Sequence, residues 1–350
     1  MADVGSERIT IYSIAKEAGV SPATVSRVLN GSQPVSGDKR ARVEEIIRRH
    51  NYRPSAIARS LTGQDTRVLG FIQPDIAHPY YNSIFVAAEQ KAMELGYTFF
   101  LGNTLNDNLR HINNMEAHYL RLMKEKHVDG VLVAGGRIND ATPTSDYVAE
   151  FGAFKSHTPI VTVSGHLPWT DCPSVTSDNR KGIFLMVNYL ASLKHERIGF
   201  LGGARGIEPT MTRLQTFREA LAEHGLEYRE EWHVEGGFGV EEGRTAMEEL
   251  LQLREKPTAI LCFNDLTAIG AIFVAHKYGL DVPGDISIAG IDNIPFSQYV
   301  HPPITTVDLR GPEQGTRAVE MLVDILHGTD GTMERVLEPR LAVRGSCASP

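Results

Sequence analysis

The stretch ITIYSIAKEAGVSPATVSRVLNG, residues 9–31, predicts a helix, a tight turn and a second helix. Four apolar residues of the first helix recur on one helical face and are expected to point inward: Ile11, Ile14, Ala15 and Ala18. Gly19 supplies the left-handed residue that ends this helix, and Val20 fills the turn. Ser21 is an N-cap, and Pro22 suits the first helical position, where its missing N–H costs no hydrogen bond. A helix-turn-helix head is therefore expected.

The second helix of this pair has one apolar side and one polar side. Val25, Val28 and Leu29 are expected to face inward. The outer side carries short side chains and one cation: Ser21, Ala23, Thr24, Ser26 and Arg27. Short side chains let a helix lie close in a DNA major groove, where an arginine can pair with a guanine edge and hydroxyl groups reach bases or phosphates. This helix is therefore a candidate for reading DNA.

A third amphipathic helix is expected within SGDKRARVEEIIRRHNY, with Val43, Ile46 and Ile47 inside and a cluster of arginines outside. The charge distribution favours a polyanionic partner. Residues 1–67 contain eleven Lys and Arg against seven Asp and Glu, a net charge of +4, and because the whole chain carries −8, residues 68–350 carry −12. A basic head on an acidic body favours DNA. A three-helix module that binds another protein is the alternative.

The next segment, NYRPSAIARSL at residues 51–61, predicts a helix that is too short to be stable alone. Pro54 suits a first helical position, and good helix formers follow it as far as Thr62. The run spans about two turns, whereas an isolated helix needs roughly 12–15 residues in water. We therefore expect this segment to fold only against a partner.

A helix-turn-helix followed at this distance by YRPSAIARSL resembles the head of the LacI/GalR (lactose-repressor) family of bacterial transcription regulators, and the resemblance extends to about Arg344. It implies that two hinge helices fold together over DNA and enter the minor groove, with Leu61 as a wedge, Ala58 beside it and Ile57 facing the partner hinge. Burial of Leu61 against the core is the alternative. The DNA contacts implied are Ser21, Ala23, Thr24, Ser26, Arg27, Asn30, Tyr52, Arg53, Ser55, Ala58 and Leu61.

From residue 68 onward, short apolar strands alternate with helical runs, the pattern of parallel α/β layers. Strands are expected at 68–74, 97–104, 130–136, 159–165, 197–203, 232–237, 259–265 and 286–293. Helices are expected at 81–96, 113–128, 180–195, 212–225, 241–253 and 267–280. These elements predict two doubly wound lobes. A further strand at 304–309 and a helix at 311–328 are expected to return across the pair of lobes.

The expected fold class is an all-α helix-turn-helix head plus an α/β two-lobed core like that of the periplasmic binding proteins, with two doubly wound parallel sheets. The expected domains are the head (1–50), a hinge helix and linker (51–67) and an effector-binding and dimerisation core (68–345). Within the core, lobe one is expected at about 68–165 and 295–310, and lobe two at about 175–290 and 311–345.

Sheets of this type bind ligands outside the carboxyl ends of their strands, and two facing lobes can close on a small molecule. The candidate effector-binding residues at these ends are Asp75, Tyr80, Tyr81, Ser164, Arg213, Phe238, Asn264 and Asp292. Aspartate, asparagine and arginine can pair with the hydroxyl groups of a polyol, while an aromatic ring covers its C–H surface. In the family, the residues that match Tyr81, Arg213, Phe238, Asn264 and Asp292 line the effector cleft.

Several of these residues have structural alternatives. Asp75 and Asp265 can serve as helix N-caps, and Tyr80 can pack on the hinge side. His166 and Trp169 are weaker candidates, because their loop varies in the family.

The effector class is expected from one departure from the family pattern. Purine-sensing members place an arginine and a threonine where this chain has Ile207 and Pro209, so a sugar or sugar derivative is expected. Most sugar-responsive relatives release DNA on binding their effector, and a corepressor-dependent repressor of the purine-sensing type is the alternative. The sequence EPRLAVRGSCASP at the end carries no leucine heptads like those of the lactose-repressor tetramer, so we expect a homodimer on a palindromic operator.

Other function classes lack support in the sequence. We find no Ser/His/Asp signature, no HExxH and no paired CxxC, and the glycines of IGFLGGARG lack the spacing of a dinucleotide fingerprint. Three unclustered cysteines argue against a disulfide framework or a metal site, and no cofactor is expected. No apolar run approaches the roughly 18 residues of a membrane span, and the polar start MADVGSERIT predicts no signal peptide, so the cytoplasm is expected. A stand-alone sugar-binding protein, or an enzyme on the same scaffold, is the alternative.

Overall fold

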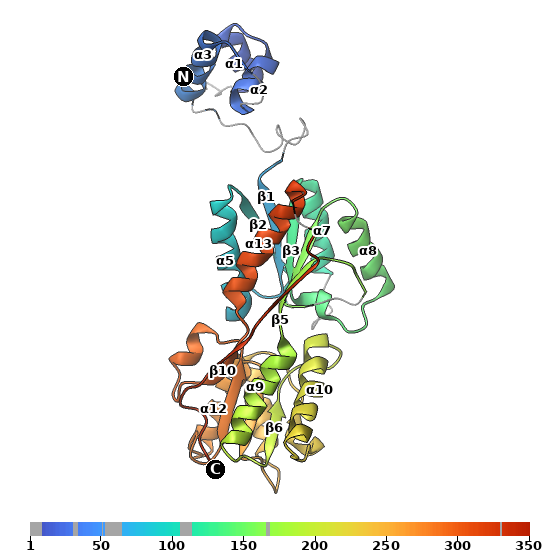
Figure 1. Cartoon of the computed structure of the whole chain (residues 1–350), viewed down its shortest axis with the longest axis vertical. Coiled ribbons are helices and arrows are strands. Elements are labelled where there is room, and N and C mark those ends of the chain that lie inside the picture. Colours follow the sequence, from blue (N-terminus) through green and yellow to red (C-terminus); the bar gives the residue numbers. More distant parts are fainter. Residues whose placement is uncertain are drawn as a thin grey trace, which may run out of the picture. The chain divides into compact units, whose positions relative to one another are not determined.

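The computed structural model describes residues 9–30, 34–50, 52, 65–105, 114–165, 169–329 and 331–350 (Figure 1). The chain divides into two compact units, a head at Met1–Thr66 and a core at Arg67–Pro350. None of the described helices is both long and apolar enough to cross a membrane.

The head contains three helices around a small apolar core: α1 (Ile11–Ala18), α2 (Pro22–Asn30) and α3 (Gly37–Arg49). Thr10 and Ser13 form a capping box at the start of α1, and Gly19 ends this helix with a left-handed φ of 65°. The Ser21 hydroxyl accepts a hydrogen bond from the backbone N–H of Thr24 at 3.2 Å, so Ser21 caps α2 as predicted. The residues predicted to face inward form the core: Ile14, Ala15, Ala18, Val25, Val28, Val43 and Ile46 are buried, and Ile11, Leu29 and Ile47 pack around them.

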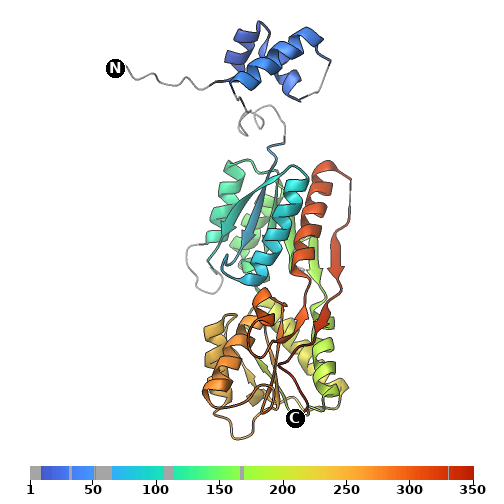
Figure 2. The ribbon, with the colours of Figure 1, turned by 90° about the vertical axis from the view of Figure 1, so that its left-hand side faces the viewer.

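The first lobe of the core is built on a parallel sheet of six strands in the order β11-β5-β4-β3-β1-β2. The strands are β1 (Val68–Gln73), β2 (Thr98–Asn103), β3 (Gly130–Ala134), β4 (Ile160–Val163), β5 (Ser174–Ser177) and β11 (Glu334–Leu337). One face is covered by α5 (Pro79–Glu94) and α13 (Gly311–His327), which lie side by side (Figures 1 and 2). The other face is covered by α7 (Met115–Glu125) and α8 (Ser145–Lys155). A short 3₁₀ helix, η1 (Gly136–Asn139), follows β3.

The second lobe is built on a sheet in the order β12-β10-β9-β8-β6-β7, in which β12 alone runs antiparallel. The strands are β6 (Ile198–Leu201), β7 (His233–Val234), β8 (Ala259–Cys262), β9 (Ser287–Ile291), β10 (Thr305–Asp308) and β12 (Arg340–Ala342). One face is covered by α9 (Asn179–Ser192) and α10 (Glu208–Glu223), and the other by α11 (Val240–Leu250) and α12 (Asp265–Lys277). Two 3₁₀ helices complete this lobe: η2 (Glu230–Trp232) and η3 (Pro295–Gln298).

The predicted division of the carboxyl-terminal segments between the lobes is wrong. Residues 295–310 belong to the second lobe, because β10 pairs in parallel with β9. Residues 311–337 belong to the first lobe, because α13 packs against α5 and β11 pairs with β5. The chain therefore passes between the lobes three times, after β5, after β10 and after β11.

Two pairs of helices approach so closely that glycine is required at the contact. A Cβ at Gly315 of α13 would overlap the carbonyl oxygen of Ile84 on α5, and a Cβ at Gly270 of α12 would overlap that of Val240 on α11. The contact at Gly315 holds α13 on the first lobe although β10, which precedes it, lies in the second.

We predict opposite effects on stability for alanine at two helical glycines. Gly315→Ala should destabilise the core by about 1–3 kcal/mol, because the added methyl group overlaps backbone atoms that cannot move independently. Gly152→Ala on α8 is the matched control: no atom lies within 4 Å of its Cβ position. This change should stabilise the core by about 0.4–1 kcal/mol. Urea unfolding of both variants measures the difference, and equal effects would contradict this account of the helix contact.

Candidate DNA interface and effector cleft

The outer side of α2 carries the side chains predicted to read DNA. Ser21, Ala23 and Arg27 are exposed, whereas Thr24 and Ser26 are partly buried. The Ser21 and Thr24 hydroxyl oxygens lie 3.0 Å apart, so both are partly used in capping the helix. No ion pair engages the Arg27 guanidinium within the described part of the head, which leaves its donors available to a nucleic acid.

Two arginines expected in the outer cluster of α3 instead connect α3 to α1. Arg49 Nη1 lies 2.8 Å from Glu17 Oε1, and Arg42 Nη1 donates to the carbonyl oxygen of Ala18 at 3.4 Å. His50 Nε2 also lies 2.8 Å from Glu17 Oε2. Exposed ion pairs of this kind contribute at most about 1 kcal/mol each, so these contacts orient the helices more than they stabilise them.

Other residues of the head depart from the sequence expectation or add to it. Tyr12 was not predicted, yet it is 72% exposed on α1, and an aromatic ring on the polar side of an amphipathic helix could have indicated a contact surface. Tyr52 is partly buried against the apolar core of the head. Asn30 is the last residue of α2. The predicted contacts of the hinge segment lie outside the described residues: Arg53, Ser55, Ala58 and Leu61.

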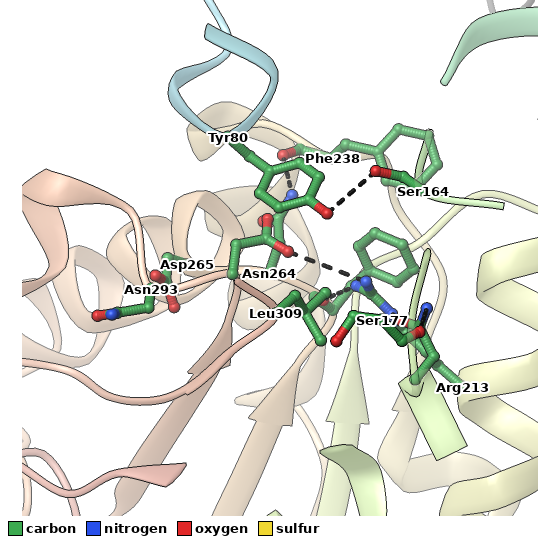
Figure 3. Close-up of polar contacts among 12 residues, drawn as sticks. Tyr80, Ser164, Ser177, Arg213, Phe238, Asn264, Asp265, Asn293 and Leu309 are labelled. Atoms are coloured by element: carbon green, nitrogen blue, oxygen red, sulfur yellow. Dashed lines mark hydrogen bonds and ion pairs between the residues drawn. The ribbon is translucent and has the colours of Figure 1, made fainter. Parts of the chain in front are cut away.

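In the core, a cavity of about 290 Å³ lies between the carboxyl ends of the two sheets. All eight residues predicted for effector binding line it: Asp75, Tyr80, Tyr81, Ser164, Arg213, Phe238, Asn264 and Asp292. They come from both lobes, and Figure 3 shows Tyr80 and Ser164 of the first lobe facing Arg213, Phe238 and Asn264 of the second. The lobe arrangement therefore brings the predicted residues together.

Arg213 is held rigidly on the second-lobe side of the cavity (Figure 3). Its Nε donates to Asn179 Oδ1 at 3.0 Å, and its Nη1 donates to the carbonyl oxygen of Phe263 at 2.7 Å. Its guanidinium carbon lies 4.4 Å from the centre of the Phe263 ring. The remaining nitrogen, Nη2, lies 3.9 Å from Asp292 Oδ1, and the two side chains are only 7% and 5% exposed. One edge of the guanidinium and one carboxylate thus face the cavity together.

Asp292 is energetically unfavourable in two respects. Its φ of 105° lies in a region that favours glycine, and its neighbour Asn293 also has a positive φ of 53°. Burial raises the pKa of Asp292 well above its usual range, although the positive charge of Arg213 opposes this effect. Its carboxylate receives no hydrogen bond from any residue that the structure describes. Strain and missing donors at one buried carboxylate are typical of a ligand-binding position.

The first-lobe side of the cavity is organised by a network of neutral hydrogen bonds. The Tyr80 hydroxyl lies 3.1 Å from the Ser164 hydroxyl and accepts a hydrogen bond from Gln314 Nε2 at 3.1 Å. Gln314 Nε2 also donates to the carbonyl oxygen of Leu309 at 2.6 Å, on the segment that leads from β10 to α13. Burial, together with the negative charge of Asp292, raises the pKa of Tyr80 to about 12. Tyr80 therefore stays protonated and can donate or accept.

Aromatic rings form the apolar walls. The rings of Phe238 and Phe263 lie 4.9 Å apart, and those of Tyr80 and Tyr81 lie 5.4 Å apart. Asn264 shapes one wall indirectly, because its amide caps α12 and its Nδ2 donates to the carbonyl oxygen of Phe238 at 2.9 Å. Facing aromatic surfaces suit a ligand with an apolar face.

Sequence reasoning missed six polar residues that line the cavity: His78, Asn139, Ser177, Asn179, Glu242 and Gln314. His78 precedes α5, and its buried Nδ1 has no hydrogen-bond partner among the described residues. Burial lowers the pKa of His78 to about 4, so its ring is neutral. The alternation of strands and helices predicts cavity residues at the ends of strands, but not on a helix such as α13 that follows a crossing between the lobes. Gln314 of α13 was missed for this reason.

Three weaker candidates lie elsewhere. Trp169 lines a separate surface pocket beside α10, and His166 lies outside the described residues. Asp265 is buried beneath the cavity and accepts hydrogen bonds from the Ile294 N–H at 2.8 Å and the Thr306 hydroxyl at 2.5 Å. Asp265 therefore organises the loop after β9, and the N-cap of α12 is its neighbour Asn264.

Asp75 is not an N-cap, because α5 is capped at His78. The Asp75 Oδ1 accepts a hydrogen bond from the backbone N–H of Ala77, in a turn ahead of α5.

No group of three or more potential metal ligands occurs in the described part of the chain, and the three cysteines are free and buried. Among the described residues that line the cavity, the acidic side chains are Asp75, Glu242 and Asp292, and the one cation is Arg213. A cavity with this balance disfavours a ligand of high negative charge and favours one that offers hydroxyl groups.

Comparison with known proteins identifies the family. The family model of bacterial regulatory proteins of the lacI family matches residues 10–55, and that of the periplasmic binding protein-like domain matches residues 187–347. The HTH-type transcriptional repressor PurR of Mannheimia succiniciproducens is 34% identical over 338 residues, covering 96% of this chain and 98% of that one. The chain belongs to the LacI family of bacterial regulatory proteins.

Other members of the LacI family extend the comparison. The repressor CytR of Escherichia coli K12 is 33% identical, with 96% of each chain covered. A solved lac repressor dimer bound to operator and the anti-inducer ONPF has a TM-score of 0.83 at 25% identity, covering 98% of this chain and 100% of that one. A complex of the regulator CelR with cellobiose has a TM-score of 0.71 at 28% identity, covering 97% and 100%. The protein is therefore a DNA-binding transcriptional regulator of the LacI type, with the predicted fold class confirmed.

We predict that Asp265 makes the stability of the core depend on pH. Burial raises the pKa of Asp265 to about 7, whereas an unfolded aspartate titrates near about 3.9. Between these values the folded protein binds more protons than the unfolded one, so stability falls as the pH rises from about 4 to 7 and levels off above it. For this group alone the slope is at most about 1.4 kcal/mol per pH unit. Asp265→Asn should remove it from the urea-unfolding profile, and an unchanged profile would contradict the assignment.

Proposed function

We propose that the protein represses transcription by binding a palindromic operator as a homodimer, and that a sugar or sugar derivative in the cleft between its lobes releases it. The observation that carries this proposal is the joint occurrence, in one LacI-family chain, of an exposed α2 surface and a cavity built around Arg213 and Asp292. The relatives support both parts, since one solved complex contains operator DNA and an anti-inducer and another contains cellobiose.

The DNA-binding half of the proposal follows from the shape of the head. Short side chains around Ala23 let α2 lie deep in a major groove, and Arg27 then reaches a base edge. One such helix reads only a few base pairs, so two heads related by two-fold symmetry read two half-sites. We propose further that the hinge segment, outside the described residues, inserts Leu61 into the minor groove between the half-sites.

The effector half follows from the chemistry of the cavity. The carboxylate of Asp292 lacks hydrogen-bond donors among the described residues, and hydroxyl groups of a ligand would supply them. The free edge of Arg213 can donate to the same ligand, and Phe238 with Tyr81 can cover its apolar face. Ile207 and Pro209 also line the cavity. We propose a neutral, hydroxyl-rich ligand for this cavity, and catalysis is no part of its role.

The site of action proposed is the cytoplasm, where the chromosome lies. In the alternative, the ligand acts as a corepressor and strengthens operator binding. Effector and operator must change each other's affinity by the same factor, typically 5–150-fold or about 1–3 kcal/mol.

One experiment tests the allosteric proposal. Monosaccharides, disaccharides, sugar acids and nucleosides are screened by thermal shift, and each hit is titrated against the complex of the protein with its operator. Release of DNA supports the proposal, and tighter binding supports the corepressor alternative. Hits that leave operator affinity unchanged would refute the allosteric role of the cavity.

We predict that Arg27 provides sequence specificity. Arg27→Ala should weaken operator binding by about 1–3 kcal/mol and relax the base preference at one position in each half-site, with little change on random DNA. Arg48→Ala, which removes the same charge from an exposed position of α3, is the matched control and should affect both DNAs equally. Binding titrations on a set of single-base operator variants measure both effects. An equal loss on operator and random DNA for Arg27→Ala would reduce Arg27 to a phosphate contact.

We predict that Asp292→Asn uncouples the protein from its effector. The amide keeps the shape of the side chain but loses the charge that strengthens its hydrogen bonds, so effector affinity should fall about 10–100-fold. Operator binding should stay intact, which leaves a permanently bound repressor. Glu249→Gln, on an exposed position of α11, is the control for loss of one negative charge. Calorimetry with a hit from the screen, followed by operator titration, measures both quantities, and normal release of DNA by the Asp292→Asn variant would contradict the prediction.

A further inference from the structure

A buried carboxyl group, that of Glu116, lies beside the cavity, on the α7 side of the first lobe. Glu116 of α7 is completely buried. Its Oε1 accepts a hydrogen bond from the Tyr147 hydroxyl on α8, and its Oε2 accepts one from the backbone N–H of Arg137 in η1 at 3.2 Å. The Arg137 guanidinium carbon lies 4.2 Å from the centre of the Tyr147 ring, and its Nη1 donates to Asn114 Oδ1 at 2.9 Å. Three elements, α7, α8 and η1, thus meet at one carboxyl group.

The carboxyl group holds η1 from one side while the cavity lies on the other. Gly135 and Gly136 enter η1 with positive φ values of 68° and 79°, and a Cβ on Gly136 would lie 3.1 Å from Glu116 Oε2. A Cβ on Gly135 would overlap the ring of Tyr81, which lines the cavity. Gly136 and Asn139 of η1 line the cavity as well. The position of η1, and with it one wall of the cavity, therefore depends on the packing of Glu116.

The residues that follow η1 join the first lobe to the second. Asp140 forms an isolated antiparallel bridge with Ile207, and the Ala141 N–H donates to the carbonyl oxygen of Gly206 at 2.9 Å. We call this contact the lobe clasp. Ile207 is the N-cap of α10, the helix that carries Arg213. One short segment thus connects the buried carboxyl group of Glu116 to the lobe that presents Arg213.

We propose that Glu116 is a positioning residue for the effector cleft: its carboxyl group holds η1 in the conformation that both lines the cavity and closes the lobe clasp. The inference rests on the proposed function of the cavity as an effector site. Glu116 touches no ligand in this arrangement and acts through η1.

The same geometry makes the clasp sensitive to pH. Burial raises the pKa of Glu116 to about 7. The hydrogen bonds from the Tyr147 hydroxyl and the Arg137 N–H, and the positive charge of Arg137, oppose this rise. The negative charge of Asp140 adds to it. Because burial is the largest of these effects, the clasped arrangement binds the proton more tightly than one in which η1 has moved away and water reaches the carboxyl group. The lobe clasp should therefore loosen as the pH rises through about 7.

Disulfide trapping measures the clasp without any effector. Because the Ala141 N–H bonds to the Gly206 carbonyl oxygen, the neighbouring residues Asp140 and Ile207 form a non-hydrogen-bonded antiparallel pair. In such a pair the Cα atoms lie about 4.5 Å apart, which allows a disulfide to form. The Asp140→Cys/Ile207→Cys double variant is oxidised with glutathione disulfide, alone and combined with Glu116→Ala, Glu116→Gln or Glu125→Gln. Glu125 is an exposed residue of the same helix α7, so Glu125→Gln is the matched control.

At pH 6, Glu116→Ala should slow cross-linking about tenfold relative to the control, the effect of losing a buried hydrogen bond that holds η1. Glu116→Gln keeps an acceptor but not the charge. Its cross-linking rate, divided by that of the control at the same pH, should be near unity at pH 6 and rise severalfold by pH 8.5, because the amide never ionises in its buried position.

Fluorescence gives a second readout in the single-tryptophan variant Trp232→Phe. The remaining Trp169 ring lies 5.6 Å from the Tyr147 ring, so its emission should titrate with a midpoint near pH 7, and Glu116→Gln should abolish this transition while Glu125→Gln keeps it. Unchanged cross-linking in both Glu116 variants, even with lowered melting temperatures, would show a purely structural role and overturn the proposal. A rate ratio that does not vary with pH would overturn its pH-dependent part. Neither assay uses an effector, so failure here is distinguishable from failure of the proposed function.

Discussion

The arrangement of the core depends on one constraint: the chain crosses between its two lobes three times, and the first two crossings carry side chains of the cavity. Ser177 and Asn179 flank the first crossing, Leu309 lies on the second, and Gln314 follows it on α13. Because both lobes are completed by segments from the other side, they can rotate relative to one another but cannot separate. A ligand between them therefore touches two of the three connections directly, the geometry expected of a hinged binding domain.

Within this frame, Arg213 and Asp292 hold two opposite charges at the base of the cavity at an energetic cost. Taking both groups out of water is expensive, and their separation of 3.9 Å recovers only part of it. Arg213 is compensated by Asn179 and the Phe263 carbonyl, whereas Asp292 retains a strained backbone and an unfilled set of acceptors. A hydroxyl-bearing ligand would relieve this imbalance, so the binding energy available at the site is set largely by the protein before the ligand arrives.

Much of this could be predicted from the sequence, and the gaps have physical causes. Alternation of apolar strands with helices predicted nearly every parallel strand, and because the carboxyl ends of such strands converge, the eight candidate residues were found at one cavity. Among the described strands and α-helices, four were not predicted: β5, β11 and β12 are short and polar or partly exposed, and α8 contains Gly152 and lacks a regular apolar stripe. The lobe assignment failed for residues 295–337, although β12 joins the second lobe as expected, because periodicity shows what an element is but not which sheet it joins. Gln314 was overlooked for the same reason.

The crossings also bear on how the polypeptide can fold as it is synthesised. The first sheet lacks its edge strand β11 until residue 337 has been made. Helix α13, which covers much of one face of this sheet, is also made late, at residues 311–327. The second lobe waits still longer, because Ser346 is fully buried, its Oγ donates to the carbonyl oxygen of Ile288 at 2.5 Å, and His195 Nε2 contacts the carbonyl oxygen of Ala348 at 2.8 Å. Neither lobe can therefore mature before residues up to about Ala348 have left the ribosome, so the core must reach its native state as one unit, whereas the small head, complete by about residue 52, can fold much earlier.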